Sequence, residues 1–433
     1  MKLLTLKQAH AAKIKKGYPL IDKEALAGSA GHVKEGDLVD IMSESGEFLA
    51  RGYYGLQNKG VGWTLTRNKQ EQIDQAFFLS KLSKAVQART KLFAAQDTTA
   101  FRLFNGEGDG VGGVTIDYYG GYLLVQWYSK GIYTFKDMLI SALDELDLDY
   151  KAIYEKKRFD TAGQYVEDDD FVKGKRGEFP IIIQENGIQY AVDLNEGAMT
   201  GIFLDQRHVR KAIRDRYAKG KTVLNTFSYT GAFSVAAALG GAEKTTSVDV
   251  ANRSMAKTIE QFSVNKLDYE AHDIKVMDVF NYFSYAAKKG LRFDLIILDP
   301  PSFARTKKRT FSAAKDYKNL LKETIAITAD KGIIVASTNS SAFGMKKFKG
   351  FIDAAFKETN ERYTIIEEFT LPEDFKTISS FPEGNYLKVV FLQKNKAKSC
   401  PVQEQLFLCR NDFLDAADAA IFKPDFNAVR MKA

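Results

Sequence analysis

The sequence predicts an α/β protein in which a Rossmann-like domain follows a small β-rich domain and a central α/β domain. From about residue 205, short β-branched apolar runs alternate with helical segments, a pattern typical of βαβ units with helices on both faces of a parallel sheet. The first 70 residues instead combine short strands with glycine-containing turns. A chain of 433 residues is long enough for roughly two to four domains of about 150 residues each. We therefore expect domains at 1–70, 71–190 and 191–395, with an extension of unassigned role at 396–433.

Composition indicates a globular protein with no membrane partner. The chain is 45% hydrophobic and 27% charged, and it lacks an apolar run of the ~18–20 residues that a membrane-spanning helix needs. The N-terminus lacks the long apolar core and small-residue cleavage site of a signal peptide, so a cytoplasmic location is expected. The cysteines, Cys400 and Cys409, show no metal-ligand spacing, and no metal site is expected.

The N-terminal unit is expected to contain a hairpin and to be followed by a helix. The apolar runs LVDIM (38–42) and FLARGYY (48–54) flank the turn-forming pair Ser45-Gly46. At 71–93, apolar residues recur at three- and four-residue spacing, which predicts an amphipathic helix.

The central region is expected to alternate hairpins with one further helix. TIDYYGGYLLVQWY (115–128) predicts a hairpin that turns at its Gly-Gly pair, and IIIQENGIQYAVDL (181–194) predicts one that turns at Asn-Gly. MLISALDEL (138–146) is expected to be helical. The polar run EDDDFVKGKRG (167–177) is expected to be a loop.

A glycine-rich motif in this region resembles a dinucleotide-binding loop. GDGVGG (108–113) matches G-x-G-x-x-G, which binds a pyrophosphate when it follows a strand and opens a helix. Here the motif precedes the strand-like run VTIDYY (114–119). We therefore expect a turn with positive φ angles rather than a cofactor loop.

The C-terminal half carries the strands of the expected parallel sheet. They lie at 222–227, 245–250, 274–279, 293–300 and 332–338. LKVVFLQK (387–394) predicts a late strand that is a candidate for the edge of the sheet.

Polar residues follow the first strands of this sheet, at the edge where open parallel sheets bind ligands. The first strand leads into NTFSYTG (225–231), a small-residue turn that does not match a Walker loop, and Ser228 and Thr230 offer hydroxyls there. The next strand ends at Asp249, where a carboxylate can accept hydrogen bonds from both hydroxyls of a ribose. The third ends at Asp278-Val279, suited to the amine and ring of an adenine. Each Asp could instead cap the helix that follows it. Together they favour a nucleoside without a phosphate chain, such as S-adenosylmethionine.

Three segments together resemble one enzyme family. TGIFLDQRHVR (200–210), FSYTGAFSVAAALGG (227–241) and LDPPSF (298–303) resemble the ribosomal RNA large-subunit methyltransferase I family, and the similarity extends to about residue 395. That family consists of class I S-adenosylmethionine-dependent enzymes with a PUA domain, a central α/β domain and a Rossmann-like catalytic domain. The resemblance implies a PUA-like RNA-binding module at 1–70 and an RNA substrate, with large-subunit ribosomal RNA as the expected one.

The resemblance also implies which residues contact the cofactor. They are Phe203, Asp205, Gln206, Arg207, Phe227, Ser228, Tyr229, Gly231, Asp249 and Asp278.

The fourth strand ends in a segment suited to holding a nucleobase. In DPPSF (299–303), the prolines fix φ and remove two N–H donors, which leaves rigid carbonyls and the carboxylate of Asp299 as acceptors for a base. Asp299 and Pro300 would hold the base, and Phe303 would stack on it once it is flipped out of its helix. The alternative is a turn with a buried Phe303.

The chain departs from the family at the fifth strand end. Members that methylate cytosine carbon 5 carry a cysteine there, whose thiolate must first add to carbon 6. This chain has Asn339 and Ser340, and a serine hydroxyl is far less ionised than a thiol near pH 7. The cytosine target implied by the resemblance therefore stays open beside a base nitrogen, for instance guanine nitrogen 7. A nitrogen lone pair attacks the methyl group directly, so positioning does most of the work, and Asn339 could hydrogen-bond a base edge.

Basic clusters support an RNA partner. The net charge is +7, with basic residues at Arg305, Lys307, Lys308 and Arg309 and again within 346–349. These residues would grip phosphates, although most charge runs are simply solvated surface. A family member that binds RNA without catalysis is the main alternative function. The sequence leaves open the target nucleotide and whether the chain is a monomer or a homodimer.

Overall fold

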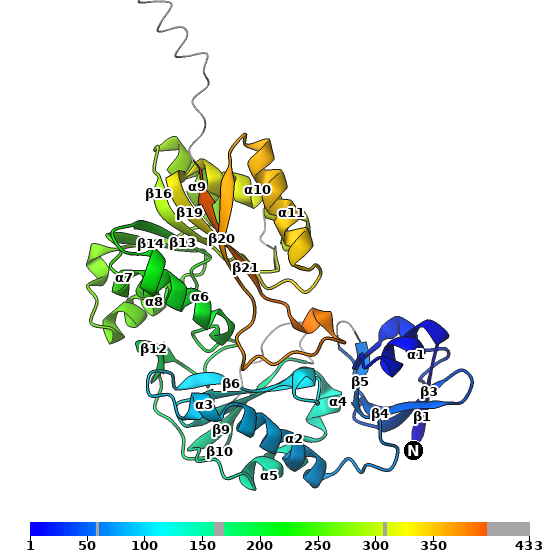
Figure 1. Ribbon diagram of the computed structural model, residues 1–433. Coiled ribbons are helices and arrows are strands. Elements are labelled where there is room, and N and C mark those ends of the chain that lie inside the picture. The colour runs from blue at the N-terminus through cyan, green and yellow to red at the C-terminus, as the bar shows by residue number, and fades with distance from the viewer. Residues whose placement is uncertain (58–59, 160–168, 306–309, 396–433) are drawn as a thin grey trace, which may run out of the picture.

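The computed structural model of the protein describes residues 1–57, 60–159, 169–305 and 310–395. Along the chain, a small N-terminal sheet is followed by a central α/β unit and then by a sheet with helices on both faces (Figure 1). This arrangement confirms the predicted fold class. No helix in the described ranges has the length and apolar character to cross a membrane. The extension at 396–433, with both cysteines, lies outside the described residues.

The N-terminal unit is a five-stranded sheet with the order β1-β3-β4-β5-β2. Its elements are β1 (Lys2–Leu6), α1 (Gln8–Lys15), β2 (Leu20–Asp22), β3 (Leu38–Ser43), β4 (Phe48–Tyr54) and β5 (Gly60–Thr66). The predicted hairpin is β3 and β4, and Gly46 in its turn has a φ of 82°. Buried side chains such as Ile21, Val39 and Ile41 form a core of their own.

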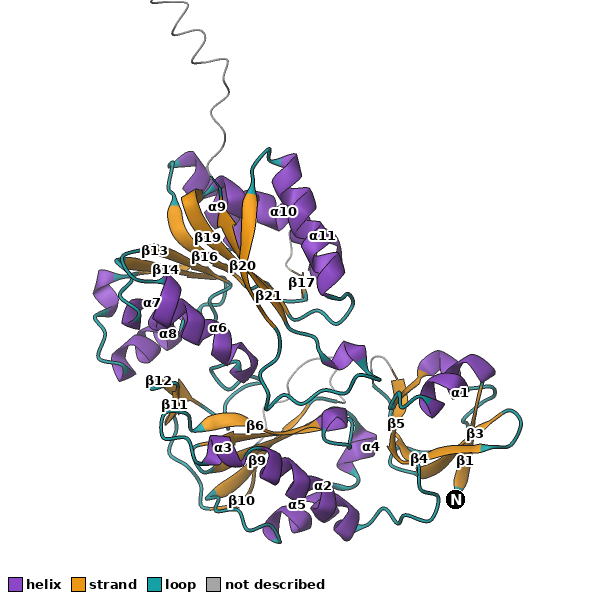
Figure 2. Ribbon diagram, viewed as in Figure 1, coloured by secondary structure: helices purple, strands orange, loops and turns teal. Residues whose placement is uncertain are grey.

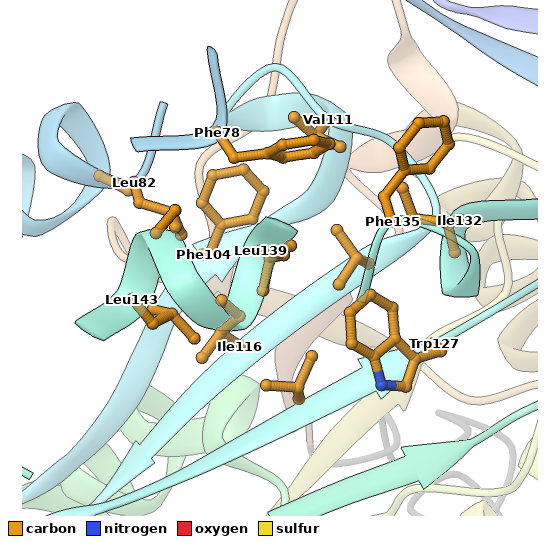
Figure 3. Close-up of a cluster of buried hydrophobic side chains, with 14 of the residues drawn as sticks. Phe78, Leu82, Phe104, Val111, Ile116, Trp127, Ile132, Phe135, Leu139 and Leu143 are labelled. Carbon is orange, nitrogen blue, oxygen red and sulfur yellow. The ribbon is translucent and has the colours of Figure 1, made fainter. Parts of the chain in front are cut away.

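The central unit is a second five-stranded sheet, with the order β10-β9-β8-β7-β6. Its elements are α2 (Gln75–Ala88), α3 (Thr90–Phe93), β6 (Ala100–Asn105), β7 (Val114–Tyr119), β8 (Tyr122–Trp127), α4 (Lys130–Tyr133), α5 (Lys136–Asp144), β9 (Ala152–Lys157) and β10 (Phe171–Gly174). Figure 3 shows Phe78 and Leu82 of α2 and Leu139 of α5 packed over the sheet residues Ile116 and Trp127. The predicted helices at 71–93 and 138–146 are thus confirmed.

Part of the expected loop at 167–177 is a strand, so that prediction was wrong there. Phe171 of β10 lies opposite Tyr154 of β9 at the edge of the central sheet. The strand forms through hydrogen bonds with a partner that is distant in sequence, and its polar composition gave no local sign of this pairing. Both predicted hairpins are confirmed. The first is β7–β8, and the second is β11 (Ile181–Glu185) with β12 (Ile188–Val192).

The glycine-rich motif forms the predicted turn. Gly110 has a φ of 98° and Gly113 a φ of 87°, and β7 follows directly. Gly108 is needed for a different reason, because a Cβ atom at this position would lie 1.8 Å from the carbonyl oxygen of Lys376. The motif therefore provides a close backbone contact between distant segments.

We expect Gly108→Ala to lower the free energy of unfolding by at least ~2 kcal/mol, because the added methyl group must displace the backbone at Lys376. The loss is measured by chemical denaturation. Gly350→Ala is the matched control, since nothing lies within 4 Å of its Cβ position in helix α11, and it should leave stability unchanged or raise it slightly. Equal stability of the two variants would contradict the contact.

The C-terminal unit is a seven-stranded sheet with the order β15-β14-β13-β16-β19-β21-β20. Its elements are α6 (Arg207–Ala212), β13 (Thr222–Thr226), α7 (Ala232–Leu239), β14 (Lys244–Asp249), α8 (Arg253–Val264), β15 (Asp273–Val276), α9 (Val279–Lys288), β16 (Phe293–Leu298), β17 (Phe303–Arg305), β18 (Thr310–Ser312), α10 (Ala313–Ala326), β19 (Thr328–Thr338), α11 (Met345–Glu358), β20 (Tyr363–Phe369) and β21 (Lys388–Lys394). Strands β13 to β16 and β19 are parallel, and β21 runs antiparallel to its neighbours. Helices α9, α10 and α11 cover one face, and α6 and α7 cover the other (Figure 2).

Strand β21 is internal, which corrects its expected place at the edge. It pairs with β19 on one side and β20 on the other, and Val389 to Leu392 are fully buried. The edge is formed by β20, whose side chains alternate between exposed and intermediate. That alternation, with charged Glu367 and Glu368, is the usual appearance of an edge strand.

The connection between β20 and β21 reaches both other units. The Asp374 carboxylate accepts a hydrogen bond from the backbone N–H of Arg102 at 2.8 Å in β6 and pairs with Arg207 at 2.7 Å. Farther along, Ser380 donates to the carbonyl of Gly17 at 2.8 Å in the N-terminal unit. The chain then returns to the C-terminal sheet, so this connection holds the sheet edge against the rest of the molecule (Figure 1).

Candidate active site

A cavity lies at the carboxyl ends of the parallel strands. It is at the point in the sheet where β14 and β15 lie on one side of β13, and β16 and β19 lie on the other. Ligands of doubly wound sheets bind at this switch point. The cavity has a volume of about 390 Å³, within the range of small-molecule sites. Its wall is formed by residues from every parallel strand end except that of β15, whose side is closed by the start of α9.

The turn after β13 has an unusual backbone. Phe227 and Tyr229 have φ angles of 54° and 53°, and Gly231, which caps α7, has a φ of 78°. The Tyr229 hydroxyl accepts a hydrogen bond from the backbone N–H of Gly201 at 2.9 Å, and Thr230 donates to the Gly201 carbonyl at 2.6 Å. The turn is thus bonded to the TGIFLDQRHVR segment (200–210), and side chains of both segments line the cavity.

The Asp249 carboxylate stands at the end of β14, held in one orientation. One oxygen accepts from the backbone N–H of Tyr229 at 2.8 Å, and the other accepts from that of Ala251 at 2.9 Å. Each carboxylate oxygen has a second lone pair. Because Asp249 lines the cavity, those lone pairs are available to a ligand with two neighbouring hydroxyls.

Asp278 caps a helix, as its alternative interpretation predicted, and it also lines the cavity, so its contact with an adenine stays a prediction. Its Oδ1 accepts from the backbone N–H groups of Phe280 and Asn281 at 3.0 and 3.1 Å and starts α9. Both bonds use the same oxygen, which leaves Oδ2 for a ligand amine. Val279 and Phe280 add an apolar wall beside it.

Asp299 lies where β16 ends, on the opposite side of the switch point. Its Oδ2 accepts from the side-chain amide of Gln206 at 3.2 Å, and removal from water raises the pKa of Asp299 to about 6. Pro300 and Pro301 line the cavity beside it. Phe303 is 62% exposed at the start of β17, so the alternative of a buried phenylalanine is wrong.

The end of β19 lies against the DPPSF turn. Asn339 lines the cavity, and its side-chain oxygen accepts from the Ser302 hydroxyl at 2.5 Å. Below it, the buried ammonium of Lys388 donates to the carbonyls of Ser340 at 2.9 Å and Tyr386 at 2.5 Å. Burial lowers the pKa of Lys388 to about 8. This lysine supports the loop from beneath.

Some side chains of FLDQR (203–207) and the residues after it line the cavity, and others pack inside the protein. Asp205 lines the cavity and accepts from the Tyr386 hydroxyl at 2.9 Å, and burial raises its pKa. Arg207, expected to contact the cofactor, is 2% exposed, pairs with Asp374 and is absent from the cavity wall. Arg210 lines the cavity instead and is held by Glu185 at 2.6 and 2.7 Å.

Most of the sequence-predicted site residues meet at this one cavity. Those that line it are Phe203, Asp205, Gln206, Phe227, Ser228, Tyr229, Thr230, Asp249, Asp278, Val279, Asp299, Pro300 and Asn339. Gly231 does not line it, and its lack of a side chain is required by Thr258, whose methyl carbon would lie 2.6 Å from an added Cβ. Arg305 ends β17 directly after the lining residue Ala304, whereas Lys307, Lys308 and Arg309 lie outside the described residues.

Several contributors were not predicted from the sequence. Met199, Arg210, Arg253 and Phe311 are part of the cavity wall, and Ser337, Tyr386 and Lys388 orient residues that line it. Arg210 had a signal, because it ends the motif TGIFLDQRHVR, and Arg253 lies four residues after Asp249. The others come from segments without a distinctive pattern, and only the folded chain places them here.

The cavity has the properties that a nucleoside sulfonium ligand requires. Carboxylates on one side can accept from ribose and adenine, aromatic and aliphatic side chains provide walls, and Asp205 and Asp299 offer negative charge toward a cation. A glycine-rich phosphate cradle is not part of its wall. The residues therefore fit S-adenosylmethionine.

Comparisons with known proteins agree with this geometry. Residues 102–382 match the family model described as S-adenosylmethionine-dependent methyltransferase, and residues 4–67 match a PUA-like domain. The chain is 95% identical over 395 residues to a Bacillus subtilis (strain 168) protein, "Putative ribosomal RNA large subunit methyltransferase YwbD", covering 91% of this chain and 100% of that one. It is 33% identical to "Ribosomal RNA large subunit methyltransferase I" of Escherichia coli O1:K1 / APEC over 89% of this chain and 97% of the relative.

A solved structure shares the whole arrangement. The structure is "Crystal structure of SMU.776, a putative methyltransferase complexed with SAH", with a TM-score of 0.84 and 39% sequence identity. The match covers 91% of this chain and 100% of that chain.

Proposed function

Because the chain belongs to the ribosomal RNA large-subunit methyltransferase I family and is an S-adenosylmethionine-dependent methyltransferase, we propose that it methylates a base of large-subunit ribosomal RNA. One observation carries the proposal: a single cavity joins the nucleoside-binding carboxylates to the DPPSF wall. Phe303 itself does not line the cavity, but its exposed ring directly precedes the lining residue Ala304 in the chain. We place this activity in the cytoplasm, where ribosomal RNA is found.

We assign the two halves of the cavity to the two reactants. Asp249 binds the ribose and Asp278 with Val279 binds the adenine, while Phe203, Asp205, Phe227 and Tyr229 surround the remainder of the cofactor. When bound, S-adenosylmethionine supplies an electrophilic methyl group on a sulfonium. Asp299 and the Pro300 carbonyl accept hydrogen bonds from the base, and Phe303 stacks on its face. The target base is flipped out of its helix to reach them.

A ring nitrogen is the atom that this site is best suited to methylate. The position where carbon-5 enzymes carry a cysteine is filled by Asn339 and Ser340, and Ser340 is 7% exposed beneath the loop. A nitrogen lone pair needs neither a thiolate nor a base that removes a carbon-bound proton. Guanine nitrogen 7 carries no proton, so the residues need only hold the ring in line with the methyl group.

We further assign RNA binding to the N-terminal PUA-like sheet and to basic residues that follow β16 and β19 in the chain. Lys346 and Lys347 are exposed at the start of α11, and Arg305 ends β17. If they neutralise phosphates, RNA affinity should fall steeply with added salt.

The test is mass spectrometry of nucleosides from large-subunit ribosomal RNA of cells with and without this protein. We expect one methylated nucleoside to disappear without the protein and to return with the wild-type chain. Purified protein and S-adenosylmethionine should restore the same mark on the unmodified RNA. Binding of that RNA with no methyl transfer would instead support the alternative of a non-catalytic RNA-binding protein.

Phe303→Ala should raise the KM for RNA about tenfold, because stacking of a base on an aromatic ring is worth ~1–3 kcal/mol. Steady-state kinetics measure this change. Stability should not change, since the ring is 62% exposed. Phe303→Tyr should keep most of the affinity, and Tyr285→Ala, which removes another exposed ring away from the cavity, should behave as wild type. An unchanged KM for Phe303→Ala would remove this ring from the base site.

A further inference from the structure

Gln206 has a buried acceptor without a partner at the base end of the cavity. It ends the short 3₁₀ helix at Leu204–Gln206, is 3% exposed and lines the cavity. Its side-chain nitrogen donates to Asp299 at 3.2 Å and to the Ser337 hydroxyl at 3.0 Å, which uses both amide hydrogens. Its oxygen, Oε1, has no hydrogen-bond partner among the residues that the structure describes.

The orientation of this amide follows from its neighbours. If the amide were rotated by 180°, its oxygen would face the carboxylate of Asp299, and two acceptors would meet without a hydrogen between them. The amide nitrogen must therefore point at Asp299, and Oε1 must point elsewhere. Buried acceptors without a partner are rare in folded proteins. Because Gln206 lines the cavity, a ligand that enters the cavity and displaces the side chain slightly can supply the missing donor.

We propose that Gln206 Oε1 accepts a hydrogen bond from the target base and, together with Asp299, selects guanine. The two acceptors belong to side chains in direct contact, since the Gln206 amide nitrogen contacts Asp299 Oδ2 at 3.2 Å. Guanine presents two adjacent donors on one edge, the ring N–H and the 2-amino group. Cytosine and adenine present one amino donor beside an acceptor nitrogen, and uracil presents one N–H between two carbonyls.

This role makes Gln206 a specificity-determining residue rather than the cofactor contact that the family resemblance implies. The inference rests on the proposed function, because it requires an RNA base in the cavity. A site built to hydrogen-bond a donor rejects analogues that lack it, because its own buried polar group is then left unpaired. The base is thus read by two neighbouring acceptors, one charged and one neutral.

The experiment compares wild type with Gln206→Met, which keeps the length of the side chain and removes the amide. The substrates are one ribosomal RNA fragment with guanosine, inosine or 2-aminopurine riboside at the methylated position found by mass spectrometry. Inosine lacks the 2-amino group, and 2-aminopurine lacks the ring N–H. The readouts are kcat/KM for each RNA, the Kd for S-adenosylmethionine and the melting temperature.

We expect wild type to lose at least about tenfold in kcat/KM on each analogue and Gln206→Met to lose about tenfold on guanosine. On one of the two analogues the variant should lose no further kcat/KM, because the donor that this analogue lacks has no acceptor in the variant. Its Kd for S-adenosylmethionine should stay within about threefold of wild type.

Three results would overturn the inference. One is a Gln206→Met variant whose kcat/KM falls on both analogues as much as that of wild type does. Another is a Kd for S-adenosylmethionine that rises by the same factor as kcat/KM falls. The third needs no variant: wild type that methylates inosine or another base as well as guanosine. In all three cases wild type still methylates ribosomal RNA, so the proposed function stands. Absence of any methyl transfer by wild type would instead refute the proposed function and the inference with it.

Discussion

Replacing Asp299 with alanine should lower kcat for methyl transfer by at least about a thousandfold and leave the Kd for S-adenosylmethionine within about threefold. The carboxylate lies beside two rigid prolines at the end of β16 and faces the base half of the cavity. A hydrogen bond to a charged group is worth ~1.5–3 kcal/mol, and the bond from the base to Asp299 also holds the ring in line with the methyl group, so its loss costs orientation as well. Single-turnover kinetics and calorimetry measure the two quantities separately.

The pH dependence of the wild type tests the same carboxylate. Burial raises the pKa of Asp299 to about 6. The carboxylate form accepts from the base, so the rate should be maximal above this value and should fall as the pH drops through it. Asp299→Asn keeps one acceptor oxygen and cannot titrate, so it should be slow and should lack this acidic limb. A wild-type rate that is flat from pH 5 to 8, or an alanine variant with normal kcat, would contradict the assignment.

Replacing Asp249 with alanine should weaken the affinity for S-adenosylmethionine by at least about a hundredfold. Two backbone N–H groups already orient the carboxylate, at 2.8 and 2.9 Å from Tyr229 and Ala251, so it meets a ribose at little entropic cost. Loss of two charge-assisted hydrogen bonds accounts for an effect of ~3 kcal/mol or more. Calorimetric titration of the cofactor measures it.

The matched control for this second prediction is Asp273→Ala. Asp273 starts the neighbouring strand β15, pairs with Lys244 at 3.0 Å and does not line the cavity. Removing it deletes an acid from the same sheet without touching the proposed ribose site. An Asp249→Ala affinity equal to that of the control would refute the ribose assignment.

Local chemistry made much of the fold predictable. Gly-Gly at 120–121 and Asn-Gly at 186–187 predicted the two hairpins, because such pairs adopt the positive φ angles that tight turns need. The βαβ strands were visible because a strand buried on both faces must be apolar along its whole length. Strands β10 and β20 were not predicted, because this apolar pattern is required only of strands that are buried on both faces. Both are edge strands, half exposed, and edge strands need no distinctive composition.

The candidate site was predictable where one residue at one strand end suffices. Asp249, Asp278 and Asp299 each stand at or just after the end of a predicted strand, and parallel topology then brings them to one edge of the sheet. Arg207 was different. It stands in a matching motif, yet its charge is used to pair with Asp374 in the connection between β20 and β21.

The sequence by itself determined the fold class, the family and the sheet edge that binds a ligand, since all three follow from patterns within short segments. The tertiary structure alone decided which side chains of a motif face the cavity. Gln206 contacts Asp299 and Ser337, and Lys388 supports the loop after β19, across separations of 93, 131 and 48 residues. Contacts at such distances depend on how whole elements pack, and no local periodicity records them.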